Sequence, residues 1–144
     1  MTLILTISFF IFLDCLYNGN NGSYSGHVRI FEWDGNSWNQ LGADIDGEAA
    51  NDNSGYSVSL SNNGNTVAIG AYNNNGNGAG SGHVRIFEWD GINWNQLGQD
   101  IDGEAAWDQS GRSVSLSDNG NTVAIGSYRS NGQAGHVRVF SFSN

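Results

Sequence analysis

The sequence predicts an all-β chain built from antiparallel sheets, and three observations support this prediction. A long segment occurs twice, several short runs alternate apolar with small polar residues, and Asn-Gly or Asp-Gly pairs separate these runs. Alternation with a period of two is typical of strands, and both dipeptides favour tight hairpin turns. No stretch shows the 3.6-residue apolar period of a helix.

The repeat is the strongest of these signals. GHVRIFEWDG occurs at 26–35 and again at 82–91, and the variant GHVRVFSFSN occupies 135–144. Residues 26–73 and 82–129 are identical at 39 of 48 positions. The spacing between copies shortens from 56 to 53 residues, and the missing residues fall in a Gly/Asn-rich loop. Because loops tolerate length changes, this pattern indicates a structural repeat.

Each full copy contains four predicted strands. HVRIFEW and SWNQLGADI flank an Asp-Gly turn, and YSVSLS and TVAIGAY flank an Asn-Gly turn. Gly in such turns allows the positive φ that short hairpins require. The strands predicted over all copies are 27–33, 38–45, 56–61, 66–71, 83–89, 94–101, 112–117, 122–127 and 136–142.

The two faces of the second hairpin differ in size. Tyr56, Val58 and Leu60 project to one side of their strand, and serines project to the other. In the next strand, large residues alternate with Ala68 and Gly70. A small, uncharged face indicates that another sheet packs closely on it, since a face in water would carry charged residues. Bulky faces stacked on small faces predict a radial stack of sheets, a partial β-propeller made of antiparallel four-stranded blades, about two and a half of them.

The hairpins also carry a family resemblance. SGYSVSLSNNGNTVAIGAY and SGRSVSLSDNGNTVAIGSY, each followed by GHVR, resemble FG-GAP repeats, the blades of integrin alpha-subunit-like propellers. The resemblance covers residues 16–144, with copies at 26–81 and 82–134 and a partial copy at 135–144. It implies that the SVSLS strand is innermost and that the chain begins and ends within blades. It further implies a non-enzymatic, extracellular or cell-surface protein for adhesion or recognition.

Residues 1–15 are a separate apolar segment. The run from Leu3 to Leu13 is too short to span a bilayer as a helix and has the length of a signal-peptide core. No Lys or Arg precedes it and Asp14 follows it, which counts against a signal peptide. The alternative is a strand that takes the place of the missing TVAIGA strand of the first blade. Both interpretations stay open here.

Composition limits the partners. Fourteen Asp and Glu residues against five Arg give a formal net charge of −9, which argues against nucleic acid and anionic membranes as partners. Cys15 is the single cysteine, so no disulfide forms within the chain. We expect a protein or glycan ligand and no cofactor. We also expect self-association or further repeats of a longer chain, because two and a half blades leave sheet faces uncovered.

Two acidic patterns are candidate cation sites. In calcium-binding FG-GAP members the inner hairpin loop carries several Asp residues, but 61–65 here has no carboxylate and 117–121 has only Asp118. Because Ca²⁺ prefers six to eight oxygens including carboxylates, we expect no calcium at these loops. The second pattern, D-I-D-G-E, gives either a cation site or an Asx turn, and we favour the turn. Its acidic residues are Asp44, Asp46, Glu48 and Asp52, repeated as Asp100, Asp102, Glu104 and Asp108.

Tryptophan and histidine offer two further candidates. The pairs Trp33/Trp38 and Trp89/Trp94 flank the Asp-Gly turns, where they either stack on a sugar or cover the hairpin, and we favour the latter. A carbohydrate-binding module is therefore an alternative function, and a non-catalytic part of a larger secreted enzyme is another. His27, His83 and His136 take one equivalent position in different blades, so we expect them not to share a metal. We assign no catalytic, cofactor-binding or metal-binding residues.

Overall fold

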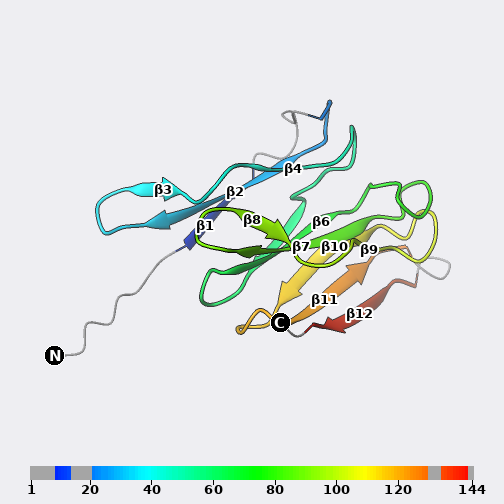
Figure 1. The fold of residues 1–144 in the computed structure, drawn as a ribbon. Helices are drawn as coiled ribbons and strands as arrows, with labels where there is room; N and C mark the ends of the chain where they lie inside the picture. The colour runs from blue at the N-terminus through cyan, green and yellow to red at the C-terminus, as the bar shows by residue number, and fades with distance from the viewer. Residues whose placement is uncertain (1–8, 14–20, 130–133, 143–144) are drawn as a thin grey trace.

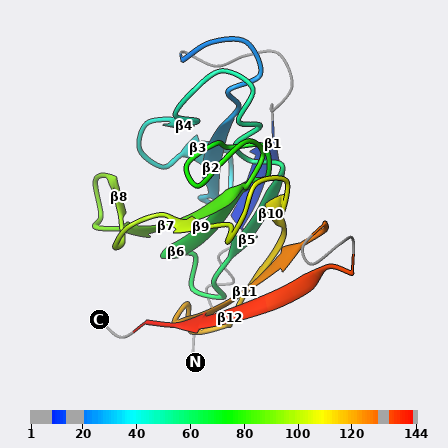
Figure 2. The same cartoon turned by 90° about the vertical axis from the view of Figure 1, so that its right-hand side faces the viewer.

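The computed structural model describes residues 9–13, 21–129 and 134–142. These residues form three antiparallel sheets, A, B and C, which follow one another along the chain and fan out in space (Figures 1 and 2). Sheet A contains β1 (Phe9–Leu13), β2 (His27–Trp33), β3 (Trp38–Gln40) and β4 (Ile45–Asp46). Sheet B contains β5 (Ser57–Leu60), β6 (Thr66–Ala71), β7 (His83–Trp89), β8 (Trp94–Gln96) and β9 (Ile101–Asp102). Sheet C contains β10 (Ser110–Leu116), β11 (Thr122–Ser127) and β12 (His136–Ser141).

The all-β prediction is confirmed, and the predicted strands differ from the observed ones mainly at the outer edges. The expected strands 38–45 and 94–101 each divide into two short ones, and both halves pair with the same neighbour, β2 or β7. Gly42 and Gly98 lie at the breaks with φ of 69° and 74°. Positive φ turns the backbone out of the strand, so the fourth strand of each blade is interrupted. No helix fit to cross a membrane occurs among the residues that the structure describes.

The N-terminal strand β1 pairs with β2 in a definite register. Phe9 lies opposite Glu32 and Leu13 opposite Val28, just as Thr66 lies opposite Glu88 and Gly70 opposite Val84 in sheet B. β1 therefore stands in sheet A where β6 stands in sheet B. The division into 1–15 and 16–144 with repeat copies as given above stays a prediction.

Two apolar cores of the same construction lie between the sheets. In each core the large side chains of one sheet pack on the smaller face of the sheet before it, which confirms the stacking predicted from the alternation. The first core contains Val28, Ile30 and Ile45 of sheet A with Val67, Ile69 and Phe87 of sheet B. The second core contains Ala68, Val84 and Ile86 of sheet B with Val123 and Ile125 of sheet C.

The small face of sheet B is small because the next innermost strand touches it. A Cβ added to Gly70 would lie 2.1 Å from the carbonyl oxygen of Gly111 in β10. Beside it, the hydroxyl of Ser57 donates a hydrogen bond of 2.6 Å to that same oxygen. The hydroxyl oxygen of Ser59 accepts a bond of 2.9 Å from the backbone N–H of Leu116. Small residues and serines are thus required where one blade meets the next.

The corresponding face of sheet C is open. Val137 and Val139 of β12 are 68% and 64% exposed, whereas their counterparts in β7, Val84 and Ile86, are 0% and 3% exposed. No described residue packs on this face as β10 packs on sheet B. The stack of sheets therefore presents an apolar face that another sheet of the same construction would fit.

Candidate functional site

An arginine surrounded by tyrosines lies at one end of sheets B and C. The guanidinium carbon of Arg112 lies 5.5 Å, 5.3 Å and 4.9 Å from the ring centroids of Tyr56, Tyr72 and Tyr128. The rings of Tyr56 and Tyr72 meet edge to face at 4.5 Å. Such cation–π contacts hold a charged side chain beside exposed aromatic rings. We call these four residues the Arg112 cluster.

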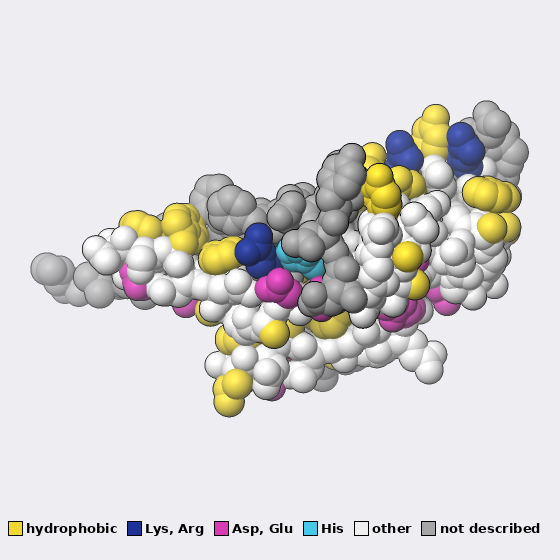
Figure 3. All heavy atoms as spheres, turned by 90° about the horizontal axis from the view of Figure 1, so that it is seen from above, with side chains coloured by type: hydrophobic (Ala, Val, Ile, Leu, Met, Phe, Trp, Pro, Cys, Tyr) yellow, Lys and Arg dark blue, Asp and Glu magenta, His cyan; other side chains and the backbone are white. Residues whose placement is uncertain are grey.

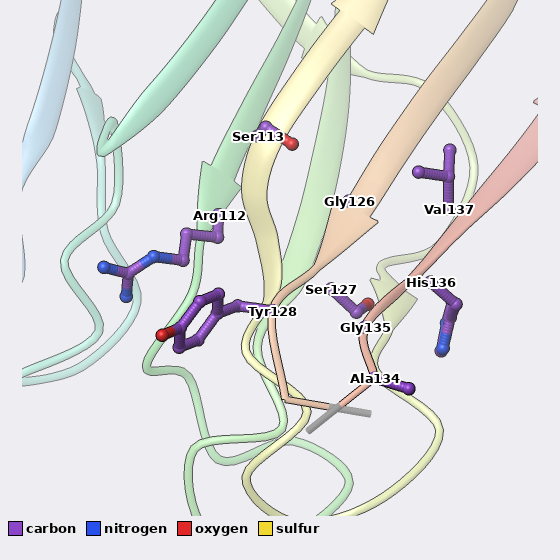
Figure 4. Close-up of a pocket in the computed structure, with 9 residues that line it drawn as sticks. All are labelled: Arg112, Ser113, Gly126, Ser127, Tyr128, Ala134, Gly135, His136 and Val137. Carbon is purple, nitrogen blue, oxygen red and sulfur yellow. The ribbon is translucent and has the colours of Figure 1, made fainter. Parts of the chain in front are cut away.

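The cluster borders a pocket of about 540 Å³ on the open face of sheet C. Figure 4 shows Arg112 and Tyr128 together on one side of the pocket, with Ser113 and Gly126 on β10 and β11 and Val137 on β12. Ser113, Gly126 and Val137 repeat the positions of Ser57, Gly70 and Val84, which β10 covers in sheet B. The pocket therefore lies where a further innermost strand would dock.

Exposed aromatic side chains gather around this end of the molecule. Tyr56, Trp107 and Tyr128 are among its most exposed large side chains. In Figure 3 hydrophobic side chains alternate with basic ones at one end of the visible face. Aromatic residues and Arg dominate binding energy at protein interfaces, and this end of the molecule combines both.

The arginines of the second and third HVR segments join neighbouring sheets. Arg85 donates a hydrogen bond of 2.7 Å to the carbonyl oxygen of Asp46, at the end of β4. Arg138 donates in the same way to the carbonyl oxygen of Asp102, at the end of β9. The D-I-D-G-E segments thus lie at the joints between sheets, where their backbones accept these bonds.

The acidic residues of those segments separate into different roles. Asp52 and Asp108 are buried, and each carboxylate accepts a backbone N–H bond from the alanine three residues earlier, Ala49 or Ala105. These bonds run back to a residue three positions earlier, so they close the turn without the forward bond of an Asx turn. Asp44 and Asp100 are nearer the surface, and each accepts a 2.7 Å bond from the glutamine four residues before it.

Glu48 and Asp100 come from different copies of the pattern and meet at His83. The Nδ1 atom of His83 lies 3.4 Å from the Oδ2 atom of Asp100 and 3.8 Å from the Oε2 atom of Glu48. Burial away from water lowers the pKa of His83, and the nearby Asp100 carboxylate opposes this shift. The sequence predicted that the three histidines do not share a metal. The structure shows a different arrangement, in which one histidine lies beside two carboxylates.

The inner hairpin loops use their side-chain oxygens internally. In the first loop the hydroxyl of Ser61 donates to the Oδ1 atom of Asn63 at 2.8 Å, and the N–H of Asn65 donates to the same atom at 3.0 Å. The second loop repeats both contacts through Ser117, Asn119 and Asn121. These oxygens stabilise a tight turn.

The two tryptophan pairs have the same internal geometry and different surroundings. The ring centroids lie 5.3 Å apart in both pairs. The Nε1–H of Trp94 donates a 3.0 Å bond to the carbonyl oxygen of Leu41 in sheet A, and Trp89 packs against Gly42. Trp33 and Trp38, in contrast, are both exposed. The structure thus favours packing between sheets for the second pair.

The turns beside the tryptophans hold unusually acidic carboxyl groups. Backbone N–H bonds from Ser37 and Asn36, with a further bond from the Asn39 side chain, lower the pKa of Asp34 to about 2. Asp90 accepts the equivalent bonds, led by the N–H of Asn93, and its pKa is lowered as well. Hydrogen bonds to a carboxylate favour its charged form.

Sequence reasoning missed the Arg112 cluster and the convergence at His83. A sequence signal existed for Asp100, because hairpin pairing places His83 opposite Asp102 and so brings Asp100 near it. The place of Glu48 depends on how sheet A packs on sheet B, which no local pattern reports. The same holds for Arg112, whose three tyrosine neighbours come from both sheets.

Comparison with known proteins shows which repeat family part of the chain is similar to. Residues 43–87, which run from the end of sheet A into β7, match the FG-GAP repeat family. No curated protein sequence matches the chain. The matched residues include the inner hairpin of sheet B and its joint to sheet A. The matched segment is therefore similar to an FG-GAP repeat, and the antiparallel sheets with their recurring joints are consistent with blades of a partial β-propeller.

Proposed function

We propose that the chain is a non-enzymatic recognition module of an extracellular or cell-surface protein, and that it binds a protein ligand through the Arg112 cluster. The observation that carries this proposal is the cluster itself. It combines an arginine held by three rings with exposed tyrosine surface, beside an open pocket. Residues of these types provide most of the binding energy in protein interfaces.

The proposal of a role without catalysis rests on the FG-GAP match, which supports a repeat module that presents surfaces.

A binding experiment tests the proposed surface. The chain is immobilised and screened against a panel of extracellular matrix and cell-surface proteins, and its hits are measured again with Arg112→Ala and Tyr128→Ala. We expect each change to weaken binding by about tenfold or more, as at interface hot spots. Ile92→Ala, in an exposed turn away from the cluster, is the matched control. Equal binding by the cluster variants and the control would contradict the assignment.

A glycan is the second candidate ligand, favoured by the exposure of Trp33 and Trp38. Aromatic faces beside Asn and Asp suit the apolar face of a sugar. A glycan array distinguishes the two functions, because sugar binding should be lost in Trp38→Ala and kept in Arg112→Ala. Trp94→Ala is a less specific test, since it also removes the bond to Leu41 that joins sheets A and B.

The extracellular location rests on the family match and can be tested on the mature protein. Pairing of β1 with β2 supports retention of residues 9–13. Mass spectrometry of protein recovered from the cell surface or medium should therefore show a chain that still contains this strand. A mature chain that starts after residue 15 would support a cleaved signal segment.

A further inference from the structure

We propose that Glu48, His83 and Asp100 form a binding site for one divalent transition-metal ion of the zinc type, located at the joint between sheets A and B. Their ligand atoms all lie within 4.8 Å of one another. Glu48 follows β4 of sheet A, whereas His83 begins β7 and Asp100 precedes β9 of sheet B. A bound ion would connect the two sheets.

His83 is the observation that points to a ligand. Its side chain is only 2% exposed, and its Nδ1 atom is buried without a hydrogen-bond partner. Buried polar atoms nearly always have a partner, so an unsatisfied nitrogen facing two carboxylates requires an explanation.

The distances suit a small tetrahedral ion. Ligand bonds of about 2.0–2.2 Å to Zn²⁺ place neighbouring ligand atoms about 3.4 Å apart. Here Nδ1 of His83 lies 3.4 Å from the Asp100 oxygen and 3.8 Å from the Glu48 oxygen. A set of one imidazole and two carboxylates suits zinc-type ions, whereas Ca²⁺ requires more oxygens than this site offers. Water would complete the coordination.

Neighbouring residues hold the two carboxylates in place. The Oδ1 atom of Asp100 accepts a 2.7 Å bond from Gln96, which leaves Oδ2 facing His83. The Oε1 atom of Glu48 lies 3.8 Å from the guanidinium of Arg85, which leaves Oε2 facing His83. Such outer contacts orient metal ligands. The positive charge of Arg85 offsets one of the two carboxylates, so the site keeps a net negative charge that favours a cation.

The repeat provides matched controls within the chain. Asp44 stands in the first copy where Asp100 stands in the second, with the same 2.7 Å bond from a glutamine. Glu104 stands where Glu48 stands in the first copy, and it lies near His136. Among the described residues, only the group at His83 brings three such ligand atoms together.

Metal titration of the full chain tests the proposal. Chelator-treated protein is titrated with Zn²⁺ against a chromophoric chelator, and its melting temperature is measured with Zn²⁺, with millimolar Ca²⁺ and with chelator alone. We expect one Zn²⁺ per chain and a higher melting temperature with Zn²⁺ only, because a ligand that binds the folded state stabilises it. Co²⁺ should give the visible absorption of a tetrahedral complex.

Paired variants locate the ion. Glu48→Gln and Asp100→Asn should each weaken Zn²⁺ binding by about tenfold or more, whereas Glu104→Gln and Asp44→Asn should change it less than about twofold. Both ligand positions are partly exposed, so these variants remain testable if His83→Gln fails to fold. Absence of saturable Zn²⁺ binding, or equal losses in the ligand variants and their controls, would overturn the proposal.

Discussion

Ser57 and Ser59 show what single side chains contribute to the joint between two blades. Their hydroxyl groups face the backbone of β10, one donating to the carbonyl oxygen of Gly111 and one accepting from the N–H of Leu116. The backbone of β10 would otherwise lack partners on the side away from β11. The serines of SVSLS are therefore explained by the neighbouring sheet rather than by their own strand.

Ser57→Ala should lower the free energy of unfolding by about 1 kcal/mol, because it removes one hydrogen bond and leaves the Gly111 oxygen without that partner. Ser113→Ala is the matched control, since Ser113 is exposed in the second copy. Urea denaturation at low protein concentration measures both. Equal losses of unfolding free energy in the two variants would mean that the hydrogen bond from Ser57 to Gly111 contributes nothing to stability.

The outer hairpin shows how one element is stabilised by its own turn. The carboxylates of Asp34 and Asp90 accept backbone and side-chain bonds that close the turn, and the glycine after each has a φ of 98°. The tilted tryptophan pair lies directly beside each turn. Turn and tryptophans together determine the register of a hairpin whose second strand is only three residues long.

These turns predict an acid-dependent loss of stability. The pKa of Asp34 is about 2 in the folded chain, below its ordinary value of 3.8, and that of Asp90 is lowered too. Their contribution is therefore present above the unfolded pKa and is lost as the pH falls from about 4 towards 2. In thermal melts, the Asp34→Asn/Asp90→Asn variant should be less stable than the parent at pH 6, with the difference shrinking towards pH 2. Melting temperatures of parent and variant that differ by the same amount at every pH would contradict this.

The whole molecule is a stack of three sheets with one joint built twice. Each joint combines a large face, a small face and an arginine that reaches the preceding sheet. The open face of sheet C carries the small half of a third such joint, with Val137 and Val139 exposed. A heterologous surface of this kind favours head-to-tail addition of another sheet.

The 144-residue chain should therefore self-associate in solution. Light scattering over a range of concentrations should give masses above 15.4 kDa, and Val137→Glu/Val139→Glu should shift them towards the monomer by placing charges on the open face. Ile92→Glu, in an exposed turn, is the control. A compact parent monomer with a cooperative melt would show that three sheets form a stable unit by themselves.

Most of the strand pattern followed from local chemistry. Alternation in HVRIFEW and TVAIGA, with glycine at the turns, located β2, β6, β7 and β11 at their observed bounds. The broken outer strands were missed because Gly42 and Gly98 lie within segments that otherwise read as continuous strands. The inner strand of sheet C also begins earlier than predicted, at Ser110, through an irregular pairing before Ser113.

The all-β class, the repeat, the hairpin turns and the bulky-on-small stacking could be predicted from the sequence, since these depend on residues close together in the chain or on side-chain size. The residues that meet across the joints are known only from the packing of the sheets. Glu48 reaches His83, and Tyr56 reaches Arg112, because the packing of one sheet on the next brings together positions far apart in sequence. The way one sheet packs on the next depends on many weak contacts spread over two faces, and no short motif encodes it.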